Sequence, residues 1–120
     1  GVMTNTERRV NLIQPIVEPP AMAKPDLWIF NQMAKRFNTE AKVNFPDKAP
    51  DIFLEMASLS KGRLCDISGM SHPELLEHRG IQWPFTETQL NNNEAPPQGG
   101  KRLYTEPTTF RYTDCKAKLI

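Results

Sequence analysis

Histidine and glutamate, which can bind metal ions and transfer protons, cluster in residues 71–80, SHPELLEHRG. On a helix, His72 and His78 would face different directions because they are six positions apart, which favours two surface imidazoles over a metal pair. Glu74, Glu77 and His78 could form a local charge cluster, but a solvated helix face explains them equally well. We therefore assign no metal ligand to this sequence.

Cysteine chemistry is restricted to Cys65 and Cys115, fifty positions apart. This spacing does not match zinc-binding or redox pairs, and two cysteines are too few for a disulfide framework. We expect two free thiols in a reducing compartment.

Known catalytic motifs are missing. The sequence contains no G-x-G-x-x-G, G-x-S-x-G or H-E-x-x-H. The run GGK at 99–101 lacks the upstream glycine and the following Ser or Thr of a phosphate loop. No catalytic residue can be assigned on these grounds.

The bulk composition excludes some classes of partner. The 120 residues include 15 basic and 14 acidic side chains, for a formal net charge of +1. This charge provides no broad field to attract nucleic acid or anionic lipid. The apolar runs fall short of the roughly 18 residues that span a bilayer. We therefore expect a soluble protein with neither nucleic-acid binding nor membrane insertion.

The best-defined element is a helix over 26–38, DLWIFNQMAKRFN. Asp26 occupies an N-cap position, and Lys35 and Arg36 lie near the C-terminal end, where the helix dipole favours cations. Apolar residues at spacings of three and four predict one stripe. It consists of Leu27, Phe30, Met33, Ala34 and Phe37.

A second helix is predicted over about 50–60, because Pro50 suits a first turn and Gly62 suits a stop. Its apolar stripe consists of Ile52, Phe53, Met56 and Leu59.

A third, short helix is predicted over 71–79. Ser71 and Glu74 have the spacing of a capping box, and Gly80 ends the helix. Its small apolar face consists of Leu75 and Leu76.

The remaining segments predict strands and loops. Residues 7–17 suit a strand interrupted at Pro15, and Pro84 argues against a central strand in the run IQWPF. Residues 86–101 are polar and read as a loop or disordered linker. The tail at 102–120 suits short hairpins. The sequence therefore predicts a mixed, helix-rich α+β fold whose apolar faces have few partners within the chain.

Four stretches, in order, carry a family resemblance. They are GVMTNTERRVN (1–11), AKPDLWIFNQMAKRF (23–37), GIQWPF (80–85) and GGKRLYTEPTTFRYTDCKAKL (99–119). Each motif alone is weak, but the ordered set spans nearly the whole chain. Together they resemble the molybdopterin oxidoreductases that carry a bis-molybdopterin guanine dinucleotide. The run TNTERRV and the phenylalanine of IQWPF are most similar to assimilatory, cytoplasmic nitrate reductases, with formate dehydrogenase catalytic subunits as the nearest alternative.

The resemblance implies a parent enzyme that reduces nitrate to nitrite at molybdenum. By family analogy the parent also holds a 4Fe-4S cluster, and the ligands of both metal centres lie outside this sequence. Its partners would be the other domains of the parent, an electron donor and a small anion. A stand-alone helical interaction module is the alternative from another class of protein.

The resemblance also implies where the chain belongs in the parent. We expect an excised piece, with 1–85 from the late part of domain III, 86–101 a flexible linker, and 102–120 leading to a C-terminal β-barrel domain. Its role would be that of a scaffold, inactive in isolation.

Asp26 is the residue that the resemblance implicates in cofactor binding. An aspartate at the corresponding Lys-x-Asp position binds the guanine dinucleotide in related nitrate reductases. A carboxylate can accept hydrogen bonds from guanine N1–H and its exocyclic amine together. The competing interpretation is the helix cap described above.

Two interpretations remain open for Asn5, Glu7, Arg8 and Arg9. These residues could line the cofactor or substrate funnel, where arginine suits an anion such as nitrate. Alternatively, they form buried ion pairs that hold the segment against neighbouring domains, which we favour.

Three further residues carry smaller expectations from the resemblance. Trp83 and Phe85 are expected to pack between domains. Cys115 stands where the family turn usually has glycine, which costs roughly 1 kcal/mol if the left-handed conformation is kept.

Overall fold

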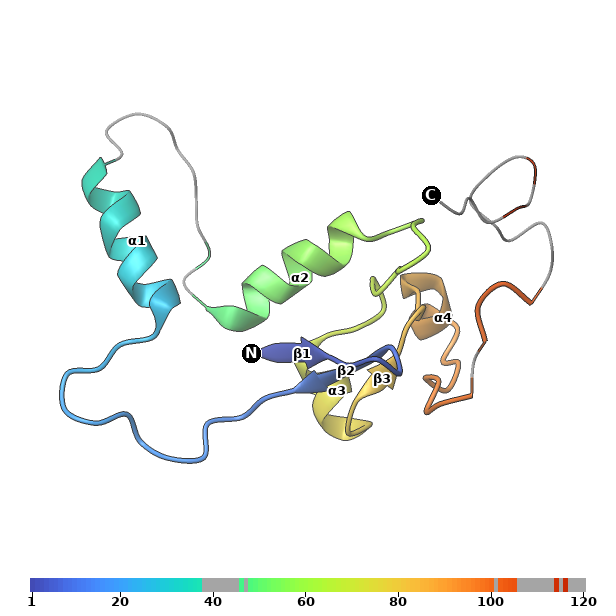
Figure 1. The fold of residues 1–120 in the computed structure, drawn as a ribbon, viewed down its shortest axis with the longest axis horizontal. Coiled ribbons are helices and arrows are strands. Elements are labelled where there is room, and N and C mark those ends of the chain that lie inside the picture. Colours follow the sequence, from blue (N-terminus) through green and yellow to red (C-terminus); the bar gives the residue numbers. More distant parts are fainter. Residues whose placement is uncertain (38–45, 47, 101, 106–113, 115, 117–120) are drawn as a thin grey trace.

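The structure is a computed structural model that describes residues 1–37, 46, 48–100, 102–105, 114 and 116. In chain order its elements are β1 (Val2–Thr4), β2 (Arg9–Leu12), α1 (Asp26–Phe37), α2 (Ala49–Leu59), α3 (His72–Glu77), β3 (Ile81–Gln82) and α4 (Glu87–Asn91). Figure 1 shows α1 apart from the sheet, with α3 and α4 near the strands. The predicted α+β class is confirmed.

The sheet is a small antiparallel one with the order β1-β2-β3. In the β1–β2 hairpin Thr4 lies opposite Val10, and Val10 also lies opposite Ile81 of β3. The strand predicted over 7–17 is confirmed only for the four residues of β2. β3 is an edge strand and precedes a cis peptide bond between Trp83 and Pro84, which agrees with the argument against a central strand.

Helix α1 confirms the helix predicted over 26–38, but Asp26 is not its cap. The carbonyl of Pro25 accepts hydrogen bonds from the amides of Trp28 and Ile29, at 2.9 and 3.2 Å. Pro25 therefore holds the cap position and Asp26 lies in the first turn. The cap prediction is wrong, although the carboxylate still lies near the positive end of the helix dipole.

Helix α2 confirms the helix predicted over 50–60, with Pro50 in its first turn. Its buried residues are Phe53 and Ala57, one turn apart on one face. The rest of the predicted stripe, Ile52, Met56 and Leu59, is exposed. The helix therefore uses a narrower apolar face than its sequence offers.

Helix α3 confirms the helix predicted over 71–79 within two residues, and of the predicted capping box only the bond to Ser71 is present. Ser71 Oγ accepts a hydrogen bond from the Glu74 amide at 3.4 Å. The chain leaves the helix through Gly80, whose φ is 99° and whose amide donates to the Leu75 carbonyl at 3.0 Å. Leu75 is buried, but Leu76 is 55% exposed, so half of the predicted apolar face is solvated.

Residues 86–101 contain a helix that the sequence analysis does not anticipate. Thr86 Oγ1 accepts from the Gln89 amide, and the Gln89 side chain accepts from the Thr86 amide, which completes a capping box before α4. The loop prediction is wrong for Glu87–Asn91, because the cap compensates for the polar composition of this stretch. Lys61 Nζ, from beyond α2, lies 2.5 Å from Glu87 Oε2.

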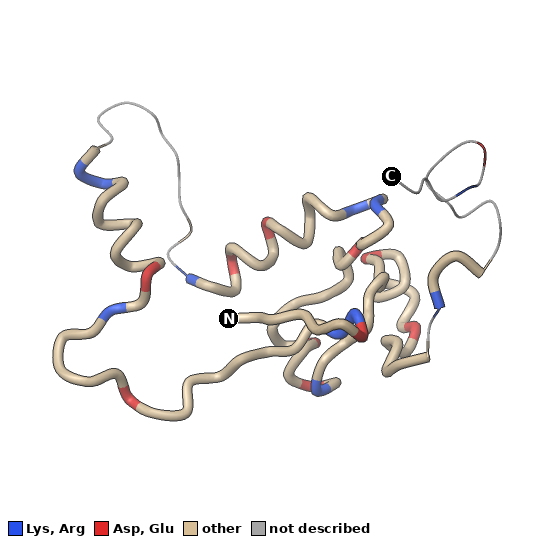
Figure 2. The backbone as a smooth tube through the Cα atoms, viewed as in Figure 1, with Lys and Arg blue, Asp and Glu red and all other residues tan. Residues whose placement is uncertain are grey.

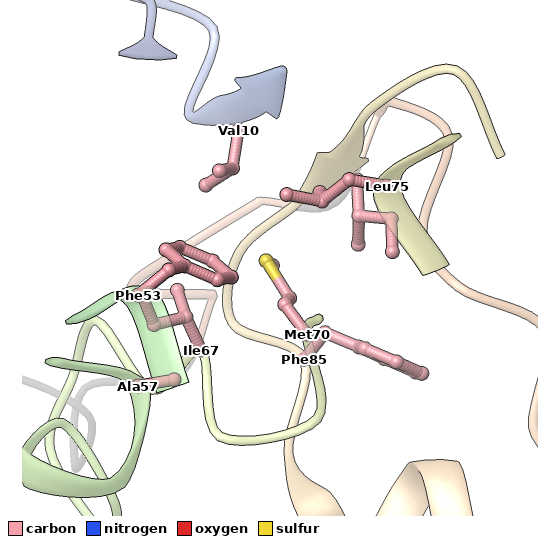
Figure 3. Close-up of a cluster of buried hydrophobic side chains, with 8 residues drawn as sticks. Val10, Phe53, Ala57, Ile67, Met70, Leu75 and Phe85 are labelled. Carbon is pink, nitrogen blue, oxygen red and sulfur yellow. The ribbon is translucent and has the colours of Figure 1, made fainter. Parts of the chain in front are cut away.

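The core is formed by side chains from most of these elements. It consists of Val10, Phe53, Ala57, Ile67, Met70, Leu75, Ile81 and Phe85. Figure 3 shows the side chains of Val10, Phe53 and Met70 turned toward one another. Phe85 is completely buried, so its predicted role in packing between domains is wrong: it packs inside this chain.

The loop that leads from α2 to α3 is held by a buried carboxylate. Asp66 Oδ2 accepts from the Gly62 amide at 2.7 Å, and Oδ1 accepts from the Ser68 amide at 2.9 Å. Next to it, Gly69 donates its amide to the Phe85 carbonyl at 3.0 Å, and a Cβ at Gly69 would collide with the Thr86 carbonyl. This loop and residues 85–86 therefore lie side by side.

Much apolar surface remains uncovered within the chain. On α1, Phe30 is 65% and Phe37 is 82% exposed, and in the connector before it Ile16 is 96% exposed. This agrees with the expectation of apolar faces with few partners. Within the described residues, we find no helix with the length and apolar character needed to cross a bilayer. The hairpins predicted for the tail lie largely outside the described residues.

Candidate functional site

The turn between β1 and β2 is organised by Asn5. Its Oδ1 accepts from the amides of Glu7 and Arg9, each at 3.0 Å, and the Arg8 amide donates to the Asn5 carbonyl at 3.0 Å. These bonds support Arg8 in the left-handed region, at φ 61°. As a result, Arg8 and Arg9 project from a fixed turn.

Arg8 binds the segment that follows β3. Its Nη1 donates to the Trp83 carbonyl at 2.8 Å, and its guanidinium carbon lies 5.3 Å from the centre of the Trp83 ring. The Trp83 amide in turn donates to the Arg8 carbonyl at 2.9 Å. A cation over an indole face adds about 0.5–2 kcal/mol to such a contact.

Arg9 joins three separate segments of the chain. Its guanidinium donates to the carbonyls of Gly80 (3.1 Å), Arg79 (3.3 Å) and Gln98. It also donates to Gln98 Oε1 at 3.4 Å. Nearby, the Gln82 amide donates to the Pro97 carbonyl at 2.9 Å, so residues 97–98 lie along the sheet edge.

A groove of about 370 Å³ opens between these residues. It is lined by Glu7, Arg8, Arg9, Gln82, Gln98, Gly99 and Gly100. The guanidinium groups of Arg8 and Arg9 already donate to backbone carbonyls of segments 79–83 and 98. The two arginines therefore hold these segments against the hairpin, and we call this arrangement the clamp. Figure 2 shows acidic and basic residues interspersed along the chain, so the arginines are not part of an extended basic stripe.

Asp26 is not part of this groove. It is exposed in the first turn of α1, which Figure 1 shows apart from the sheet. Close to it, Lys24 Nζ lies 6.0 Å from the ring centre of Trp28. The cofactor contact expected of Asp26 therefore stays a prediction, and the structure shows its carboxylate exposed in the first turn of α1.

The two histidines differ in their surroundings. The His72 ring lies 5.7 Å from that of Phe53, and its Nε2 is buried without a hydrogen-bond partner among the described atoms. Burial lowers the pKa of His72. His78 Nε2 lies 3.7 Å from Glu74 Oε2. His72 is therefore not the surface imidazole that the spacing predicts, whereas His78 is partly exposed and lies close to the Glu74 carboxylate.

Other predicted positions are described only in part. Cys65 is an exposed free thiol, as expected. Cys115 lies outside the described residues, and of its sequence neighbours Lys116 donates its amide to Asp114 Oδ1 at 3.1 Å. Sequence reasoning missed Gln82 and Gln98, because an isolated glutamine carries no motif.

Comparison with known proteins finds relatives whose names are those of redox enzymes. It is 39% identical over 88% of its length to a nitrate reductase of Synechocystis and 35% identical over 99% to the assimilatory nitrate reductase catalytic subunit of Bacillus subtilis. It is also 39% identical over 70% of its length to the F420-dependent formate dehydrogenase 2 subunit alpha of Methanococcus maripaludis.

The chain spans 14%, 15% and 12% of the length of these three relatives, in that order. Neither a family model nor a solved structure matches it. Each of the three matches covers at least 70% of the chain. The chain belongs to the molybdopterin oxidoreductase family, as the homologue of one segment of its nitrate reductase and formate dehydrogenase members.

Proposed function

We propose that the chain is part of a molybdenum-dependent assimilatory nitrate reductase. Such an enzyme converts nitrate, two electrons and two protons into nitrite and water by oxygen-atom transfer. The observation that supports this reaction is the 35% identity over 99% of the chain to an assimilatory nitrate reductase catalytic subunit. The cofactor would be a molybdenum bis-molybdopterin guanine dinucleotide, with a 4Fe-4S cluster supplying electrons from a donor protein in the cytoplasm.

The role of this segment is to support the cofactor site and connect domains. Asp26 would bind the guanine base, because its carboxylate is exposed in the first turn of α1. Asn5, Arg8 and Arg9 would hold the shape of the segment, because their recorded hydrogen bonds join the hairpin, β3 and residues 97–98. Residues 1–85 would belong to domain III, and 102–120 would lead to the C-terminal domain.

The reaction is tested with the protein encoded by the whole gene. Reduced artificial donors and nitrate should yield nitrite, whereas the 120-residue chain alone should be inactive. Formate oxidation by the whole protein, without nitrate reduction, would instead support the second candidate. That candidate is a formate dehydrogenase, favoured by the 39% identity to a formate dehydrogenase subunit.

The cofactor contact is tested by Asp26→Asn in the whole protein. An asparagine side chain keeps one oxygen acceptor but replaces the other with an NH₂ donor, which would face the N–H donors of guanine. The amount of cofactor bound per protein should therefore fall. Asp51→Asn is the matched control, because Asp51 is also an exposed acid in the first turn of a helix. Equal cofactor content in the two variants would contradict the contact.

A further inference from the structure

A second groove lies between α3 and the segment that follows α4. It has a volume of about 270 Å³. Its lining includes Glu74, Glu77 and His78 from α3 and its C-terminal end, and Asn93 and Glu94 from the segment after α4. Nitrogen and oxygen donors therefore come to one groove from two parts of the chain that are far apart in sequence.

The donors on the α3 side are close enough to share one ion. One ligand atom from each of Glu74, Glu77 and His78 lies within 4.8 Å of the other two. Two atoms that each bind one ion at about 2.0–2.2 Å lie at most about 4.4 Å apart. Small rotations of these side chains would therefore bring all three atoms to a single ion.

The backbone that carries these donors is well anchored. Leu75, between the ligands, is almost completely buried, and the His78 amide donates to the Glu74 carbonyl at 3.0 Å. In the segment after α4, the Glu94 amide donates to the Gln89 carbonyl at 3.0 Å, and Gln89 Nε2 donates to Glu94 Oε2 at 3.1 Å. Ligands on fixed elements lose little freedom when an ion binds.

The donor set indicates which class of ion would bind. Three carboxylates face the groove, and the recorded ionic contact among them is the one between Glu74 and His78. An imidazole nitrogen distinguishes the group from an acidic surface that would attract Mg²⁺ or Ca²⁺. Imidazole together with carboxylates suits Zn²⁺ and similar transition metals.

We propose that Glu74, Glu77 and His78 bind a divalent transition-metal ion of the Zn²⁺ type, with water completing its coordination. The ion would join Glu74 in the first turn of α3 to His78 at its C-terminal end and so stabilise this short helix. This site involves residues that the proposed nitrate reductase function does not use, so either proposal can fail without the other.

The test is a Zn²⁺ titration of the metal-free 120-residue chain by calorimetry, with helix content followed by circular dichroism. We expect one ion per chain. Removing a residue that only orients a metal ligand weakens metal binding by about 10- to 100-fold. His78→Gln and Glu77→Gln each remove a ligand itself, so each should weaken Zn²⁺ binding at least that much. Mg²⁺ at the same concentration should not compete.

Two control variants separate this site from other donors. Cys65→Ser removes an exposed thiol and His72→Gln removes the other imidazole, and neither should change the affinity. The proposal is overturned if the chain shows no saturable binding, or if binding survives in His78→Gln. If the metal-free chain contains no helix, the original chain and His78→Gln are compared by the helix content that each gains when Zn²⁺ is added. The proposal is also overturned if the original chain gains none.

Discussion

Arg9 is one of three consecutive charged residues at 7–9, but its side chain donates hydrogen bonds to two other segments of the chain, 79–80 and 98. We expect Arg9→Gln to lower the free energy of unfolding by about 1–3 kcal/mol, because carbonyls of Gly80 and Gln98 lose their donor. Urea denaturation measures this. Arg36→Gln on exposed α1 is the control and should change stability by less than about 0.5 kcal/mol.

An effect of Arg9→Gln no larger than that of Arg36→Gln would contradict the clamp. The guanidinium would then be available for an anion, which is the funnel interpretation. A lysine at position 9 should restore only part of the stability, because an ammonium group cannot reach several carbonyls with a planar fork.

Asp66 should make stability depend on pH. Burial alone raises the pKa of its carboxyl, but hydrogen bonds from Ser68 and Gly62 outweigh burial and hold the pKa below the ordinary value. A carboxyl with a lowered pKa in the folded state contributes stability above its unfolded pKa of about 3.9, and this contribution is lost as pH falls through the folded pKa. The free energy of unfolding should therefore drop in acid.

Asp66→Asn should remove this dependence and cost about 1–3 kcal/mol at pH 7, because an amide group would face one of the two N–H donors. The measurement is urea denaturation at several pH values between about 3 and 7. Asp51→Asn, on an exposed turn of α2, should leave both the stability and its acid dependence nearly unchanged. If Asp66→Asn and Asp51→Asn lose the same amount of stability in acid, Asp66 is not the source of the acid dependence.

Among the elements, sequence and structure agree where periodicity and caps act together. The bounds of α2 and α3 are predicted within one to two residues, because Pro50 and Ser71 mark their starts, and α1 is predicted from its apolar spacing although its cap is not Asp26. The strands are predicted less well: β1 and β3 have three and two residues, too few for an alternating pattern. Around β3, Arg9 donates to the Gly80 carbonyl and Gln82 Nε2 donates to the Glu7 carbonyl, and no local sequence pattern encodes these long-range contacts.

Helix α4 shows how a cap can outweigh composition. We expect Thr86→Ala to cost α4 about 1 kcal/mol, because the Gln89 amide loses its side-chain acceptor. Amides of residues 87–91 should then exchange with solvent hydrogen about fivefold faster. Thr88→Ala, an exposed change in the same helix, is the control. Exchange in the original chain as fast as in an unfolded peptide would contradict α4 itself.

At the scale of the whole molecule, the candidate site could be predicted only in part. The family resemblance selected the hairpin arginines and Asp26, and the structure puts the arginines in one groove but leaves Asp26 on a separate helix. Sequence could not show this, because the relation between α1 and the sheet depends on a connector rich in proline that follows no periodic pattern. The relatives are about seven times longer than this chain, and in the nitrate reductase proposed above other parts of the enzyme would cover α1.

The exposed stripe of α1 should therefore contribute little to the stability of this chain but much to its association. Phe30→Gln combined with Phe37→Gln should change the free energy of unfolding by less than about 1 kcal/mol, because both rings are mostly solvated. The same double variant should self-associate less in sedimentation experiments, because contiguous apolar surface promotes contacts between molecules. Phe53→Gln is the contrasting control: that ring is only 3% exposed, and its loss should cost about 3–5 kcal/mol. Comparable losses of stability in the double variant and in Phe53→Gln would mean that α1 packs within the chain rather than presenting its stripe to other parts of a larger protein.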